Sequence, residues 1–340
     1  MNCKERVLNS VKFQGVDRVP CGLFGTDFGY QWELADRIGC ETVEEMYRKL
    51  DVDIWHTVNG LKYSGRGYKY RGKEINPWAP FYFERNPEPP FANITSVEQV
   101  LEYPVPAFDE YDASGYKREL KDHEEFSICG GINSAIFHNY LYMCGQINAL
   151  CYLKTEPEIA LAIIDKITSL WEVYLDVALE AADGRVDIIE NCNDFGTQNS
   201  MFMSPEDFRV FFKPALLRLY KKIKDKNILL MQHSCGAVGP IIPDFIEMGA
   251  DIFNPVQISA SGMDFKPLID KYKGKIAFYG GLDTQYLLPS GPPERIREET
   301  LKALSYFGRE GGYILSGSQG LLEDIPIEHA LAMLDPELRK

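Results

Sequence analysis

The second half of the chain alternates short β-rich runs with amphipathic helical patterns, and this alternation most constrains the fold. Five such pairs follow one another between 186 and 334. Regular strand–helix alternation predicts a parallel sheet, because a parallel crossover needs a dozen or more residues. Ser204 and Pro205 predict the start of one helix, which reaches 224. The strands predicted in this half are 186–190, 227–233, 250–254, 275–279 and 312–316.

The first half is less regular but adds strand-like runs at 19–24, 52–58 and 126–129. The total of about eight strands predicts an α/β protein built as a (β/α)8 TIM-type barrel. An open doubly wound sheet is the alternative, but the chain has neither a GxGxxG nor a GxxxxGK[ST] motif to favour it. We expect one domain over 1–340 with N-terminal elaborations, including a loop insertion at 62–96 near the barrel mouth.

The charge balance excludes several kinds of partner. Lys and Arg total 36 against 50 Asp and Glu, a net charge of −14, whereas nucleic acids and anionic membranes are bound through Lys and Arg. The eight cysteines form no CxxC pair, which favours a reducing compartment. The first residues lack an apolar signal core, and no apolar run approaches ~18 residues. We therefore expect a cytoplasmic protein that binds neither nucleic acid nor membrane.

Polar residues follow each of the five late strands, where a parallel barrel places its active site. His233 and Cys235 are the sharpest signal, because imidazole nitrogen and thiolate sulfur both ligate zinc and an H-x-C pair can aim them at one point. The alternative is chance spacing, with Cys235 an inert buried thiol. The polar runs are 190–194, 233–236, 254–257, 280–283 and 316–319.

Two other polar positions have equally simple structural interpretations. Asp194 could act as a general base or counter-charge, or it could cap an Asx-type turn before Gly196. Asp283 follows two glycines, which allow either close approach to a ligand or merely a tight turn. We expect His56 and His138 to be structural histidines.

Several runs, taken in order along the chain, resemble the uroporphyrinogen decarboxylase superfamily. The resemblance implies a (β/α)8 barrel and strengthens the metal interpretation. The runs that carry it are 4–8 with 17–20, 193–196 with 204–205, 233–236, 254–257 and 280–285.

Two chemistries occur in that superfamily, and the residues here distinguish them. True decarboxylases of this superfamily carry arginines shortly after the Arg-x-Pro element, and these pair with the carboxylates of the porphyrinogen. In this chain the corresponding segment, 22–29, contains no arginine. The H-x-C-G element instead resembles corrinoid-dependent methyltransferases. In their thiol-methylating members the His and Cys ligate zinc together with a late Cys. The first two fall on His233 and Cys235, but 316–319 contains no cysteine. A carboxylate such as Glu190 or Asp194, another oxygen, or no zinc at all are the alternatives.

The resemblance therefore implies a methyltransferase that moves a methyl group from an O- or N-methylated small molecule to the cobalt of a separate corrinoid protein, assisted by zinc. Three alternatives stay open: methylcobalamin-dependent transfer to a thiol or folate, a metal-free decarboxylase, and a non-catalytic binding protein. The residues assigned are His233, Cys235 and Glu190 for zinc, Asn193, Gln257 and Gln319 for substrate, and Asp194, Tyr279 and Asp283 for catalysis.

Overall fold

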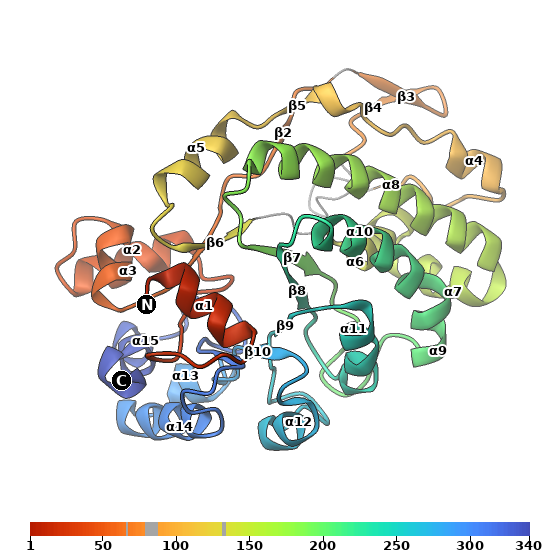
Figure 1. Ribbon diagram of the computed structural model, residues 1–340. Helices are drawn as coiled ribbons and strands as arrows, with labels where there is room; N and C mark the ends of the chain where they lie inside the picture. Colours follow the sequence, from red (N-terminus) through yellow and green to blue (C-terminus); the bar gives the residue numbers. More distant parts are fainter. Residues whose placement is uncertain (66, 79–87, 131–133) are drawn as a thin grey trace.

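A curled parallel sheet forms the centre of the computed structural model, which describes residues 1–65, 67–78, 88–130 and 134–340 (Figure 1). The sheet has seven strands in the order β1-β6-β7-β8-β9-β10-β11. The predicted α/β class and parallel pairing are confirmed. The strands are β1 (Ile54–His56), β6 (Ser127–Gly130), β7 (Ile188–Cys192), β8 (Leu229–His233), β9 (Ile252–Asn254), β10 (Ala277–Tyr279) and β11 (Tyr313–Ile314).

The remaining predicted strand, 19–24, is only a short link between the two outer strands of this sheet. Cys21 bridges Leu315, just beyond β11, and Gly22 bridges Ile54 of β1, both in parallel. The Gly22 N–H donates to Leu315 O at 3.1 Å, and the Leu315 N–H donates to Pro20 O at 2.8 Å. Pro20 has no N–H to extend this ladder. The described residues thus form seven strands and a pair of bridges where the sequence predicted eight strands, so the curled parallel sheet is confirmed and the complete (β/α)8 barrel stays a prediction.

Apolar side chains fill the inside of the curled sheet. Every one of the seven strands contributes to one buried cluster, as a packed barrel interior requires. Val7 and Val11 of α1 (Cys3–Val11) join this cluster, and Lys4 pairs with Asp187 just before β7 at 3.6 Å. Helix α1 therefore covers the end at which the strands begin, and the opposite end is left for chemistry.

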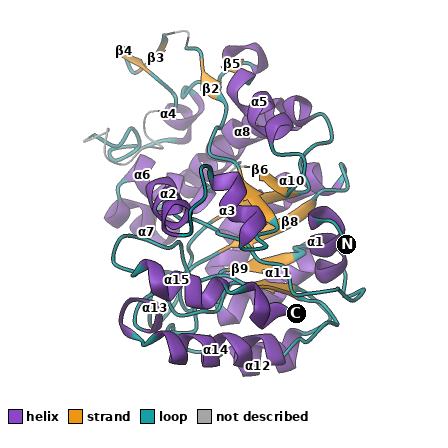
Figure 2. Cartoon of the chain, turned by 90° about the vertical axis from the view of Figure 1, so that its left-hand side faces the viewer, coloured by secondary structure: helices purple, strands orange, loops and turns teal. Residues whose placement is uncertain are grey.

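Helices surround the sheet, and the two figures show them on its outer side (Figures 1 and 2).

The helix start predicted at Ser204 is confirmed, because Ser204 Oγ accepts the Asp207 N–H and Pro205 occupies the first turn. Within the described ranges, no helix combines the length and apolarity needed to cross a bilayer. The helices are α2 (Phe28–Arg37), α3 (Val43–Lys49), α4 (Val97–Leu101), α5 (Ser114–Asp122), α6 (Ile136–Cys144), α7 (Gln146–Thr155), α8 (Pro157–Ala182), α9 (Pro205–Asp207), α10 (Lys213–Lys224), α11 (Ile242–Met248), α12 (Phe265–Tyr272), α13 (Leu287–Ser290), α14 (Pro293–Ser305) and α15 (Ile327–Leu334).

The predicted insertion at 62–96 forms part of a small antiparallel extension. Strand β2 (Lys62–Tyr63) pairs with β5 (Tyr111–Asp112), and β3 (Tyr68–Tyr70) pairs with β4 (Lys73–Ile75). These strands lie apart from the main sheet, on the side of α5 and α8 (Figure 2). Residues 66 and 79–87 of the predicted range lie outside the described residues.

A buried ion cluster ties the amino-terminal segment to the start of β1. The fully buried Asp53 accepts hydrogen bonds from Arg6 at 2.7 Å and from Arg18 at 2.7 and 2.9 Å. The Cys21 N–H also donates to this carboxylate, at 3.0 Å. Two guanidinium groups therefore balance one buried charge, and Asp17 pairs with the Nε of Arg6 at 2.7 Å. The arginines of the amino-terminal motif thus serve the architecture.

We expect Asp53→Asn to lower the free energy of unfolding by about 3 kcal/mol, because it leaves Arg6 and Arg18 without their buried counter-charge. Chemical denaturation would measure the change. The matched control is Asp176→Asn, which removes a partly exposed pair with Lys222 at 2.8 Å and should cost less than about 1 kcal/mol. Equal losses in the two variants would contradict a special role for the Asp53 cluster.

Candidate functional site

The carboxyl ends of three neighbouring strands bring polar side chains together. In the parallel register Cys192 of β7 lies opposite His233 of β8, and His233 lies opposite Asn254 of β9. Asp194 follows β7, and Cys235 follows β8. This end of the sheet is where parallel α/β folds place their active sites.

Hydrogen bonding fixes the orientation of the His233 ring. Its Nδ1 donates to Asn254 Oδ1 at 2.7 Å, so its Nε2 faces the open side, 3.2 Å from Asp194 Oδ1 and 3.4 Å from Cys235 Sγ. The Phe24 ring packs against the imidazole with 4.9 Å between centroids. Such support of one ring nitrogen, with the other turned toward ligating groups, is the usual arrangement of a metal-binding histidine.

Asp194 connects two histidines and the loop after β8. Its Oδ1 accepts the Cys235 N–H at 2.8 Å, and its Oδ2 lies 3.3 Å from His138 Nε2. Burial opposes ionisation, but the hydrogen bonds from His138 and His233 outweigh it and hold the Asp194 pKa well below its usual range. The carboxylate is therefore ionised at neutral pH. Sequence reasoning assigned His138 a structural role, and no local pattern marked it, because it comes from the distant helix α6.

The donor atoms around His233 form two overlapping groups that suit a metal ion. One group joins His233 to Asp194 and Cys235, and the other joins it to Glu190 and Cys192, with the atoms of each group within 4.8 Å of one another. Carboxylate oxygen, imidazole nitrogen and thiolate sulfur are ligands that zinc takes. The sequence analysis did not single out Cys192, although it lies within the polar run 190–194, at the end of β7.

Glu190 stands on the other side of His233 from Cys235. Its Oε1 is 4.0 Å from His233 Nδ1 and is buried without a hydrogen-bond partner among the described residues. Burial raises the Glu190 pKa to about 7. A buried carboxyl oxygen without a partner is uncommon in proteins, and a bound ion is one way to satisfy it. The residues present therefore fit a metal ion.

The two predicted glutamines both reach the loop that carries Cys235. Gln319 Nε2 donates to Cys235 Sγ at 3.1 Å. Gln257 Oε1 accepts the Gly236 N–H at 2.7 Å, and its Nε2 donates to Gln198 Oε1 at 3.1 Å. Gln319 thus contacts the sulfur from the segment in which the family resemblance implied a third cysteine.

Asn193 is held entirely by the protein. Its Oδ1 accepts the Phe137 N–H at 2.7 Å, and its Nδ2 donates to Asn191 Oδ1 at 2.7 Å and to Ser134 O at 3.1 Å. The side chain is fully buried. Its assigned role in substrate binding stays a prediction, and its observed role is to order the turn that carries Asp194.

Tyr279 lies inside the curled sheet and is paired with His56. Its hydroxyl lies 2.9 Å from His56 Nε2, and Phe24 contacts both rings. Gly22 leaves the space that the tyrosine needs, because a Cβ there would lie 1.9 Å from the Tyr279 hydroxyl oxygen. Burial raises the Tyr279 pKa well above its usual value, so this phenol stays protonated.

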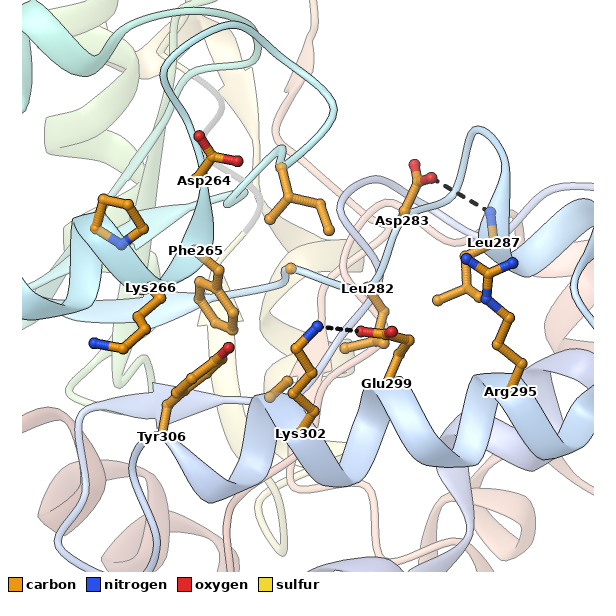
Figure 3. Close-up of a pocket in the computed structure, with 14 residues that line it drawn as sticks. Asp264, Phe265, Lys266, Leu282, Asp283, Leu287, Arg295, Glu299, Lys302 and Tyr306 are labelled. Atoms are coloured by element: carbon orange, nitrogen blue, oxygen red, sulfur yellow. Dashed lines mark hydrogen bonds and ion pairs between the residues drawn. The ribbon is translucent and has the colours of Figure 1, made fainter.

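Asp283 lies in a different cavity, of about 580 Å³, between the start of α12 and helix α14 (Figure 3). Its carboxylate accepts the N–H groups of Gln285 at 3.0 Å and Leu287 at 3.3 Å. The structure thus favours the tight-turn interpretation. Within the described part of the chain, no hydrogen bond or ion pair joins Asp283 to His233, and its catalytic role stays a prediction.

The chain is similar in sequence to uroporphyrinogen decarboxylases. The family model described as uroporphyrinogen decarboxylase (URO-D) matches residues 82–336. A uroporphyrinogen decarboxylase of Bacillus cytotoxicus is 24% identical over 178 residues, which cover 51% of this chain and 46% of that protein. The one from Geotalea daltonii is 25% identical over 182 residues, covering 53% and 48%. The chain thus spans about half the length of the curated relatives it matches.

A solved structure matches over a greater length. It is described as a methyltransferase from Methanosarcina mazei and superposes with a TM-score of 0.70 at 18% identity, covering 98% of this chain and 97% of the other. At this identity the likeness concerns the fold, and it extends the TIM-barrel-like architecture over nearly the whole chain.

We expect Gly236→Ala to destabilise the protein by about 3 kcal/mol or more, since both conformation and space oppose a side chain there. Gly236 has φ +85°, and a Cβ would lie 2.4 Å from the Gly196 carbonyl carbon. Gly184→Ala is the control, with φ +75° but nothing within 4 Å, so it should cost only about 1 kcal/mol. Denaturant titration would measure the free energy of unfolding of both variants. The control reports the cost of the backbone conformation alone, so similar losses in the two variants would contradict a cost from crowding at Gly236.

Proposed function

Because the chain belongs to the uroporphyrinogen decarboxylase family, as its motifs predicted, we propose that it is a methyltransferase of that superfamily. It takes a methyl group from an O- or N-methylated small molecule and passes it to the corrinoid of a separate protein. The observation that carries the proposal is the donor group formed by Asp194, His233 and Cys235. The fold shared with the Methanosarcina mazei methyltransferase supports it.

The distribution of arginine argues against a polycarboxylate substrate. Segment 22–29, which leads to the site, has none. Arg6 and Arg18 are bound to Asp53, which precedes β1 at the opposite end of the sheet. The charged groups around His233 are instead the carboxyl groups of Glu190 and Asp194. A porphyrinogen that carries many carboxylates would be repelled there, so decarboxylation of that substrate is disfavoured.

Zinc is the metal that this donor group fits best, with His233 and Cys235 as two ligands and a carboxylate as the third. The placement favours Asp194, because it lies on the Nε2 side of His233 with Cys235, whereas Glu190 lies beside Nδ1. When bound, a zinc ion supplies Lewis acidity that stabilises negative charge on a departing oxygen. Gln319 is placed to orient the Cys235 sulfur or an incoming substrate.

With an O-methylated donor, the methyl–oxygen bond must break with its electron pair left on oxygen. The methyl carbon would take its new bonding pair from the cobalt(I) of a corrinoid held by the partner protein, and the departing oxygen would take a proton. His138 is placed to donate that proton, because it contacts Asp194 and also lines a cavity beside the site. Asn254 and the Cys235 N–H hold His233 and Asp194 in position. These side chains therefore need little rearrangement when a substrate binds, which lowers the barrier to reaction.

Elemental analysis of the purified protein tests the metal assignment. We expect about one equivalent of zinc, which His233→Ala and Cys235→Ala should each abolish. Asp194→Asn should weaken zinc binding more than Glu190→Gln does. Cys151→Ala, at an exposed cysteine outside the site, should leave the zinc content unchanged. A wild-type protein that holds no zinc even after reconstitution would overturn the zinc assignment.

Methyl transfer is tested with cob(I)alamin or a corrinoid protein and a panel of methylated donors. We expect the absorbance of methylcobalamin to appear with the wild-type protein and to fall at least about 100-fold in rate in the His233→Ala variant. Formation of no methylcobalamin with any donor would contradict the proposal. Chelator-insensitive release of carbon dioxide from a carboxylated substrate would instead support the decarboxylase alternative.

A further inference from the structure

The cavity of about 580 Å³ that contains Asp283 lies outside the candidate metal site, between the start of α12, the loop after β10 and helix α14 (Figure 3). Its volume is within the range of about 300–1,000 Å³ that is usual for small-molecule sites. Acidic, basic and apolar side chains all line it. We refer to it as the charged groove.

One wall of the charged groove is apolar and has a fixed shape. The Phe265 ring packs edge-to-face on Tyr306, with 5.9 Å between centroids. The same ring lies against Gly281, the second of the two glycines before Asp283, where an added Cβ would lie 3.2 Å from its Cζ. Gly281 has φ +105°, so both conformation and space favour glycine there. This apolar surface is therefore in place before a ligand arrives.

Two of the cations of the charged groove are already paired with anions. Lys302 Nζ donates to Glu299 Oε2 at 3.1 Å (Figure 3). Lys266 pairs with Asp270 of the same helix at 2.6 Å. Each pair carries no net charge, so neither pair selects strongly for the charge of a ligand.

Three further charged groups remain for a ligand to use. The Asp264 side chain makes no capping hydrogen bond to α12. Asp283 accepts the N–H groups of Gln285 and Leu287, which orient its carboxylate without neutralising the charge. Arg295 is exposed on α14 and forms no ion pair within the described part of the chain. The groove thus presents a guanidinium group and two carboxylates beside an apolar wall.

We infer that the charged groove binds a free α-amino acid with an apolar side chain. The guanidinium of Arg295 suits the carboxylate of such a ligand, because its fork of N–H groups can bond both oxygens. The carboxylates of Asp264 and Asp283 suit the ammonium group, and the wall formed by Phe265 suits the side chain. A ligand with a single charge would leave part of this set without a partner.

The inference does not depend on the proposed function. The described residues that line the charged groove do not include His233, Cys235 or Asp194. An amino acid bound there would therefore occupy a second site, apart from the groups to which methyl transfer is assigned.

Binding to the full-length wild-type protein tests the ligand class without requiring a variant. Isothermal titration calorimetry compares leucine with two analogues that keep its side chain. The first, 4-methylpentanoate, lacks the ammonium group, and the second, 3-methylbutylamine, lacks the carboxylate. We expect leucine to bind at least about tenfold more tightly than either analogue. A smaller preference, or no binding of leucine, would overturn the inference.

Glycine tests the apolar wall, because it has both charges of leucine but no side chain. We expect glycine to bind at least about tenfold more weakly than leucine, since it buries no apolar surface on the wall formed by Phe265. Equal binding of the two amino acids would contradict selection for an apolar side chain.

Variants locate the binding in the charged groove. Arg295→Gln should weaken leucine binding about fivefold, and Asp264→Asn about threefold, because each removes one charge partner. The matched controls are Arg309→Gln and Asp225→Asn, at exposed residues that do not line the groove, and they should have no effect. Unchanged binding in both Arg295→Gln and Asp264→Asn would show that leucine binds elsewhere and overturn the inference.

The metal site needs its own control, because zinc also binds nitrogen and carboxylate ligands. His233→Ala should leave leucine binding unchanged. Loss of binding in His233→Ala, with no loss in Arg295→Gln, would assign leucine to the metal site and overturn the inference. Leucine binding that depends on Arg295, in a protein that forms no methylcobalamin from any donor, would contradict the proposed function and support this inference.

Discussion

The parallel pairing of β7 with β8 and of β8 with β9 is the constraint on which the site depends. It places Cys192, His233 and Asn254 at one level, so His233 can bond to Asn254 through one nitrogen and face Asp194 and Cys235 with the other. Side chains alternate between the two faces of a strand. A register shift of one residue in β8 would therefore turn His233 away from the site and remove it from both donor groups.

The two ends of the sheet carry different kinds of charged group. At the end where the strands begin, Arg6 and Arg18 balance the buried Asp53, which secures the amino-terminal helix. At the opposite end, the groups around His233 are carboxyl, thiol and amide groups. The arginines of the amino-terminal motif therefore stabilise the fold and do not reach the groups around His233.

Local patterns were sufficient to predict the sheet and the central part of the site. Strand–helix alternation predicted parallel pairing, Ser204 and Pro205 marked a helix start, and the His233–Cys235 spacing predicted two side chains that do converge. Contacts between distant segments could not be predicted in the same way. His138 reaches Asp194 from α6, and Gln319 reaches Cys235 from beyond β11. Such contacts depend on how loops cross the end of the sheet, which no residue spacing encodes.

The close approach of Gly196 and Gly236 also has a mechanical consequence. The loops after β7 and β8 touch backbone to backbone there, and the Ala237 N–H donates to Thr197 O at 2.8 Å. One loop carries Asp194 and the other carries Cys235, so a displacement of either loop displaces both side chains. The distance between these two groups is thereby set by the backbone contact between the loops. In the described residues, neither the Gln319 loop nor the antiparallel extension shares a backbone hydrogen bond with this pair of loops, so a shift of either would leave the spacing of Asp194 and Cys235 unchanged.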